Sequence, residues 1–242
     1  MKKGLMIAVA VAIAAALGVF AQRHLASRNH PASTSPATEV AASAATSSDA
    51  AATDPNAPAA EAAAPKVPET LPQFELADRD GKKRTLKEWS GRPLMVNYWA
   101  TWCGPCRREI PLLNSLRKQR ASQRLEIIGI AVDFRDDVLK YAQETTIDYP
   151  LLIGEEDGLE AVKAMGMQPA FPFTVFADSK QRIVALKVGE LHQDEADLIL
   201  DRVLAIDAGK TPLATAREEI TEGLKQIATR RAAEAGSPAK TD

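Results

Sequence analysis

The chain of 242 residues contains two cysteines, Cys103 and Cys106, and two residues separate them. An apolar run over 94–100 precedes the pair, and apolar residues at helical spacing follow it over 107–119. A strand that delivers a Cys-x-x-Cys pair to the start of a helix is the geometry of a thiol–disulfide exchange site. The residue types therefore predict redox chemistry between the two sulfurs.

The expected place of each cysteine on the helix predicts its role. Cys103 would lie at the N-terminus, where unpaired backbone N–H groups and the helix dipole favour the thiolate, the attacking species. We therefore expect Cys103 to be exposed and to form the mixed disulfide with a partner. Cys106, one turn further on, would be more buried and would resolve that disulfide. Gly104 and Pro105 keep the sulfurs close at the first turn, where proline is tolerated.

Other uses of the cysteine pair explain the spacing less well. A structural disulfide across two residues would close a very small loop and stabilise the fold little. A zinc site needs about four protein ligands, whereas the chain adds only three histidines, two of them near the N-terminus. We therefore expect no metal and no cofactor. The net charge of -2, with mixed signs, also argues against a nucleic-acid partner.

The N-terminal third of the chain has the composition of a targeting and linking region. Lys2 and Lys3 precede the uncharged stretch 4–21, which predicts a signal anchor or a cleavable signal peptide over 1–22. Residues 23–68 are rich in Ala, Pro and Ser, too poor in large apolar residues to fold, and are expected to form a disordered tether. A tether after a membrane segment favours the anchor over the cleaved signal.

Strand-like and helix-like segments alternate over 69–208, which predicts one α/β domain with a central mixed sheet flanked by helices. The expected strands are 74–76, 82–85, 94–100, 125–132, 151–153, 173–176 and 182–188, the first two forming a hairpin. The expected helices are 86–89, 103–120, 136–145, 159–165 and 194–206, with Pro111 kinking the second.

Residues 209–242 are predicted to form one more helix and a tail. Leu213, Ile220, Leu224 and Ile227 fall at helical spacing and form a narrow apolar stripe. This helix would pack on its own domain or, alternatively, bind a partner. Disorder is expected from Ala232 onward.

The run 96–111, which reads VNYWATWCGPCRREIP, resembles the thioredoxin superfamily, and more narrowly the TlpA/ResA-like group of exported thioredoxins. A second match is 170–176. In that group this position carries a proline after a cis peptide bond, which faces the cysteines and pairs with the substrate backbone. The resemblance assigns that role to Pro172 and implies a thioredoxin-like fold, here with an N-terminal hairpin and an extra C-terminal helix.

The resemblance implies a thiol–disulfide oxidoreductase on the periplasmic face of the bacterial inner membrane, held by the N-terminal segment, or soluble in the periplasm if that segment is cleaved. Its partners would be protein thiols and disulfides, such as apocytochrome c or copper-centre assembly proteins, with electrons from a membrane thiol donor. The Gly-Pro dipeptide matches reducing thioredoxins. A disulfide-introducing oxidase and a redox-inert binding module are the alternatives.

The chain departs from the thioredoxin pattern at Asn97, where a buried acid is common. Asn cannot accept a proton. The TlpA/ResA-like group often has an acid in the loop after the next strand, where Asp136 or Asp137 falls, so the resemblance implies Asp136 as the base for Cys106. Glu109 is expected to be a surface residue. Trp102 and Phe171 would form an apolar lip for the substrate, beside Gly104 and Pro105. The remaining aromatic residues, Phe134 among them, are expected in core or edge packing.

Overall fold

The computed structural model describes residues 66–236. The predicted anchor, all but the last residues of the predicted tether, and the end of the tail lie outside this range. Within 66–236, no helix combines the length and the apolar character needed to cross a bilayer.

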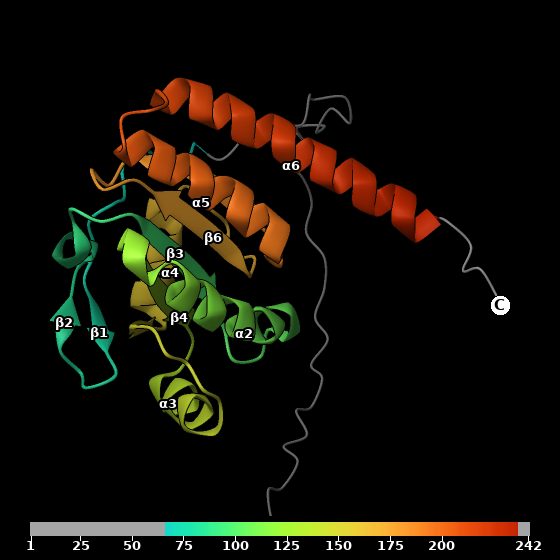
Figure 1. Ribbon diagram of the computed structural model, residues 1–242. Coiled ribbons are helices and arrows are strands. Elements are labelled where there is room, and N and C mark those ends of the chain that lie inside the picture. Colours follow the sequence, from blue (N-terminus) through green and yellow to red (C-terminus); the bar gives the residue numbers. More distant parts are fainter. Residues whose placement is uncertain (1–65, 237–242) are drawn as a thin grey trace, which may run out of the picture. The chain divides into compact units, whose positions relative to one another are not determined.

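Seven strands form one sheet in the order β2-β1-β5-β4-β3-β6-β7 (Figure 1). They are β1 (Leu76–Asp78), β2 (Lys83–Arg84), β3 (Leu94–Trp99), β4 (Glu126–Val132), β5 (Leu151–Gly154), β6 (Phe173–Ala177) and β7 (Ile183–Val188). The central strands β3, β4 and β5 are parallel, and the outer pairs are antiparallel. The predicted α/β class and mixed sheet are confirmed.

The helices lie close to their predicted positions. They are α2 (Gly104–Gln119), α3 (Arg135–Glu144), α4 (Glu156–Ala164), α5 (Gln193–Asp207) and α6 (Leu213–Gly236), with two short 3-10 helices, η2 (Leu86–Trp89) and η3 (Ala121–Gln123). Pro111 lies inside α2. Helix α4 begins three residues earlier than expected, because Glu156 and Asp157 suit a helix N-terminus.

The sheet is covered on both faces because successive side chains of its central strands point to opposite sides. From β3, Met95 and Trp99 enter a core shared with α2, α3, α5 and α6. Leu94, Val96 and Tyr98 enter the other core, which contains the buried residues of α4 and η2. This two-sided burial holds the end of β3, and the cysteine pair that follows it, in a fixed place.

Helix α6 lies beside α5 (Figure 1). Ile220 and Ile227 are buried, as the predicted stripe requires, and Gly223 permits close approach: a Cβ there would lie 2.6 Å from Leu198 Cδ2. The helix continues to Gly236, so the expectation of disorder was wrong for residues 232–236; the rest of the expected tail lies outside the described residues. Residues 230–235 include Arg, Ala and Glu, which are strong helix formers.

Candidate active site

The two cysteines lie where β3 meets α2, and they are joined by a disulfide bond. Cys103 is the N-cap residue of α2, and its Sγ accepts a hydrogen bond of 3.3 Å from the Cys106 backbone N–H. Gly104 and Pro105 form the first turn between them. The sulfur of Cys103 thus lies at the N-terminal end of the helix, where the dipole favours negative charge.

Cys106 is more buried than Cys103, as expected, but both side chains are shielded from solvent. Cys106 is fully buried and Cys103 is only 5% exposed. The expectation of an exposed Cys103 was therefore wrong for this disulfide-bonded form. The residues on either side of Cys103 in the sequence, Trp102 and Gly104, are exposed, so the surface next to Cys103 is open to a partner.

The peptide bond between Phe171 and Pro172 is cis, as the family resemblance implied. Phe173 pairs with Tyr98 in the antiparallel register of β6 and β3, so Pro172 lies across from the end of β3, next to the cysteine loop. The Pro172 carbonyl accepts a hydrogen bond of 2.8 Å from the Gly189 N–H. The position of Pro172 is therefore fixed both by the pairing of β6 with β3 and by Gly189, which directly follows β7.

Aromatic side chains border the disulfide on its exposed side. Trp102 is 69% exposed and meets Phe171 edge-on, with ring centroids 6.0 Å apart. Phe171 is stacked on Phe173, which is stacked on Tyr98, so the half-exposed lip rests on a buried aromatic column.

Phe134 also borders this site, and its assignment to core or edge packing was wrong. Its side chain is 58% exposed. With Trp102 and Phe171 it lines a hollow of about 240 Å³. Phe134 therefore extends the apolar surface that Trp102 and Phe171 form beside the cysteine loop.

Glu109 was expected on the surface, but it is 2% exposed. Its Oε1 accepts a hydrogen bond of 2.7 Å from Asn97 Nδ2, and its Oε2 accepts one of 2.9 Å from the Leu191 N–H. Asn97 Nδ2 also donates to Thr174 Oγ1, at 3.0 Å. Glu109 follows Cys106 by three residues, so the two share one face of α2.

Burial raises the pKa of Glu109 to about 7, and the hydrogen bonds from Leu191 and Asn97 offset part of that rise. The carboxyl group can therefore hold or release a proton near neutral pH, which Asn97 cannot do. The signal for this site was present in the sequence: position 109 falls on the buried side of α2 with Cys106 and Leu113.

Asp136 does not lie in a comparable environment. It is exposed in the first turn of α3, where a charged carboxylate interacts favourably with the helix dipole. Asp136 therefore lacks the burial and the hydrogen-bond partners that surround Glu109.

Asp133, three residues before Asp136, is the acid that contacts the cysteine loop. It is 7% exposed, and its Oδ2 accepts hydrogen bonds from the Thr101 N–H at 2.9 Å and from Thr101 Oγ1 at 2.5 Å. These bonds tie the end of β4 to the loop that precedes Cys103, a positioning role that sequence reasoning missed.

A short strap, defined here as residues 189–191, closes the other side of the site. Its backbone N–H groups reach the Pro172 carbonyl and the Glu109 carboxylate. Arg108 of α2 holds the strap through Glu190, with an N–O contact of 2.5 Å. Because the strap contacts the proline, the helix and the buried acid together, it links the three parts of the site.

Among residues 66–236, no group of three or more His, Cys, Asp or Glu side chains is placed to hold a metal ion.

Residues 67–186 match the AhpC/TSA family. The chain is 28% identical over 144 residues to the thiol-disulfide oxidoreductase ResA of Geobacillus thermodenitrificans, covering 59% of this chain and 81% of that protein. It is 29% identical over 136 residues to the thioredoxin-like protein YneN of Bacillus subtilis, covering 54% and 76%.

A solved structure described as a protein disulfide isomerase from Bacteroides thetaiotaomicron superposes with a TM-score of 0.52 at 26% identity, covering 60% of this chain and 96% of that one. A structure described as the thiol:disulfide interchange protein DsbE from Chlorobium tepidum gives a TM-score of 0.51 at 17% identity, covering 60% and 99%. The second likeness concerns the fold alone.

Proposed function

Because this chain belongs to the TlpA/ResA-like group of the thioredoxin superfamily and is a thiol–disulfide oxidoreductase, we propose that it reduces disulfides of exported proteins in the cell envelope. The observation that carries the proposal is the cysteine pair at the N-terminus of α2, beside a cis proline and a buried carboxyl group. The direction of electron flow rests on the Gly104-Pro105 dipeptide, which matches reducing thioredoxins.

In the proposed reaction, the Cys103 thiolate attacks one sulfur of a substrate disulfide. The substrate disulfide breaks, a mixed disulfide forms with Cys103, and the other substrate sulfur leaves and takes a proton. The Cys106 thiolate then attacks Cys103 Sγ and releases the second substrate thiol. Substrate gains two electrons and two protons, and the protein is left with the Cys103–Cys106 disulfide seen here.

Cys106 is fully buried, so its proton needs an acceptor inside the protein before it can attack. Glu109 is the suitable group, since it lies on the same face of α2 and its pKa is raised to about 7 by burial. Pro172 and the apolar lip of Trp102 and Phe171 would bind the substrate backbone and side chains. Gly104 and Pro105 would face it at the first turn.

The cellular setting is also part of the proposal. Residues 1–22 would anchor the protein at the periplasmic face of the inner membrane, 23–68 would tether the domain, and a membrane thiol donor would re-reduce the disulfide. Apocytochrome c or copper-centre assembly proteins are suitable substrates. The support is the sequence pattern of the N-terminus and the likeness to ResA.

The reduction potential of the Cys103–Cys106 couple tests the direction. The full chain is equilibrated with defined thiol buffers, and the fraction of disulfide is measured. A value near that of thioredoxin, roughly -270 mV, is expected; a value near roughly -120 mV would instead show a disulfide-introducing oxidase.

The variant Cys106→Ser tests the order of attack. Mixed disulfides with exported proteins should accumulate through Cys103, while Cys103→Ser should trap none. If neither variant traps a partner and the cellular function survives both changes, the domain is a redox-inert binding module.

A further inference from the structure

A hollow of about 450 Å³ lies at the end of the parallel strands where β3 and β4 begin. Four cations and two carboxylates line it: Arg92, Arg117, Lys118, Arg124, Glu126 and Asp148. We propose that this hollow, called the basic pocket below, binds a phosphate group.

The basic pocket is separate from the redox site. Glu126 pairs with Leu94 at the first position of the parallel β3–β4 register, and the cysteine loop follows Trp99 at the other end of β3. Six residues of extended strand span about 20 Å. A ligand in the pocket would therefore leave the disulfide free to react.

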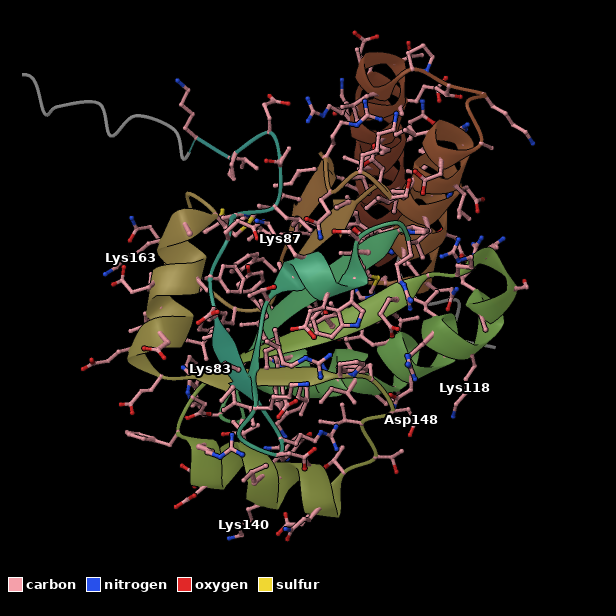
Figure 2. All side chains as sticks on the ribbon, turned by 90° about the vertical axis from the view of Figure 1, so that its left-hand side faces the viewer. Lys83, Lys87, Lys118, Lys140, Asp148 and Lys163 are labelled. Atoms are coloured by element: carbon pink, nitrogen blue, oxygen red, sulfur yellow. A yellow bond between two sulfur atoms is a disulfide. The ribbon has the colours of Figure 1, made fainter. Side chains whose placement is uncertain are left out.

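Both carboxylates of the pocket already have cationic partners. Glu126 bridges two guanidinium groups, with its Oε1 2.9 Å from Arg117 Nε and its Oε2 3.3 Å from Arg92 Nη1. Asp148 Oδ2 lies 2.7 Å from Lys118 Nζ, and Figure 2 shows these two side chains at one corner of the domain. Four cations around two carboxylates leave two positive charges in excess.

Two of the arginines keep unused hydrogen-bond donors. Arg92 Nε is buried without a partner. Arg124 is exposed, and its guanidinium forms no hydrogen bond or ion pair with another residue of the range 66–236. Arg117 and Lys118 are in the last turn of α2, where cations stabilise the helix dipole. That explanation does not extend to Arg92 and Arg124, which lie outside the helix.

A phosphate group matches what the pocket offers. Guanidinium groups bind phosphate oxygens through paired N–H donors, and a dianion would neutralise the two excess charges. The phosphate could come from a free ion or from a phospholipid headgroup. In the second case the domain would rest on a bilayer with its disulfide facing away from the lipid.

The first test uses the full chain with inorganic phosphate, at constant ionic strength set by chloride. The thermal midpoint should rise with phosphate and saturate, because a ligand that binds only the folded state stabilises it. Arg124→Gln should weaken the apparent affinity at least tenfold. Its side chain has no partner to lose, so the variant should fold; Lys140→Gln, on α3 and away from the pocket (Figure 2), is the matched control.

The second test identifies the source of the phosphate. Hydrogen exchange of residues 117–126 is compared with the full chain on phosphatidylglycerol and on phosphatidylcholine vesicles. Slower exchange on phosphatidylglycerol alone, lost in Arg124→Gln and kept in Lys140→Gln, indicates a lipid headgroup. Saturable stabilisation by inorganic phosphate without that protection indicates a free ion. The proposal is overturned if neither occurs, or if Arg124→Gln and Lys140→Gln behave alike.

Discussion

Two buried glutamates at opposite ends of the domain, Glu109 and Glu126, have different partners. Glu109 is 2% exposed and accepts hydrogen bonds from an amide side chain and a backbone N–H. Glu126 is 8% exposed and lies between the guanidinium groups of Arg92 and Arg117. The two carboxyl groups are therefore similarly buried, but neutral hydrogen-bond donors surround Glu109 near the disulfide, whereas cations surround Glu126 at the opposite end of the domain.

The difference shows that the partner, and not burial alone, decides what a buried carboxyl group does. Neutral donors stabilise the charged form only in part, so Glu109 can exchange a proton near neutral pH. Two guanidinium groups give Glu126 full charge pairing, which suits a structural role. One residue type can therefore exchange a proton near neutral pH in one place and bridge two guanidinium groups in another.

The largest expected effect is the dependence of folding stability on pH in the disulfide-bonded protein. The pKa of Glu109 is raised from 4.5 to about 7, so its contribution is fully present below about 4.5 and is lost as pH rises through 7. The loss is about 3 kcal/mol. Denaturant unfolding at pH 5 and pH 8 measures most of this loss, because part of it has already occurred at pH 5, and Glu109→Gln should flatten the difference. If the free energy of unfolding of Glu109→Gln depends on pH as strongly as that of the wild type, another group is responsible for the titration.

The rate of resolution by Cys106 should fall in Glu109→Gln by roughly 100-fold near neutral pH, since general acid–base groups contribute at least about that much. Stopped-flow reduction of a peptide disulfide at several pH values measures it, with the pH profile losing its step near 7. Asp136→Asn is the control and should keep the wild-type rate. A slow resolution step in Asp136→Asn together with a wild-type rate in Glu109→Gln would instead identify Asp136 as the base.

Glu126→Gln should lower the free energy of unfolding by about 1–3 kcal/mol at pH 7. The change leaves two guanidinium groups without their carboxylate, although their partial exposure reduces the penalty. The free energy of unfolding of Glu109→Gln, measured in the same way at pH 8, should be unchanged or higher than that of the wild type. Equal destabilisation by both substitutions would remove the distinction between the two glutamates.

The smallest effect is expected at the strap. Arg108→Gln breaks the contact with Glu190, an exposed pair worth less than about 1 kcal/mol in stability. It should nevertheless shift the pH step assigned to Glu109, because the strap donates a hydrogen bond to that carboxylate. Arg107→Gln removes a neighbouring exposed charge and should shift nothing. Identical pH profiles for the two variants would show that the ion pair does not position the strap.

The sequence predicted the strands, the helices and the cysteine pair because each depends on local pattern. It placed Glu109 wrongly, although a buried-strand Asn97 needs a hydrogen-bond partner and position 109 lies on the buried side of α2. Asp133 and Asp136 flank one helix start, and only tertiary structure shows which of them turns toward Thr101. The basic pocket draws on separate segments of the chain, so no single motif could have indicated it.

The edge strand β7 is covered along part of its length by other parts of the chain. Residues 69–71 pair with 181–183, and Arg217 of α6 donates to the Ile183 carbonyl through Nε at 3.2 Å and Nη2 at 2.6 Å. Unpaired strand edges recruit other extended chains. The covered part of the β7 edge is therefore closed to extended segments of other molecules, which lowers the tendency of the domain to add strands and aggregate there.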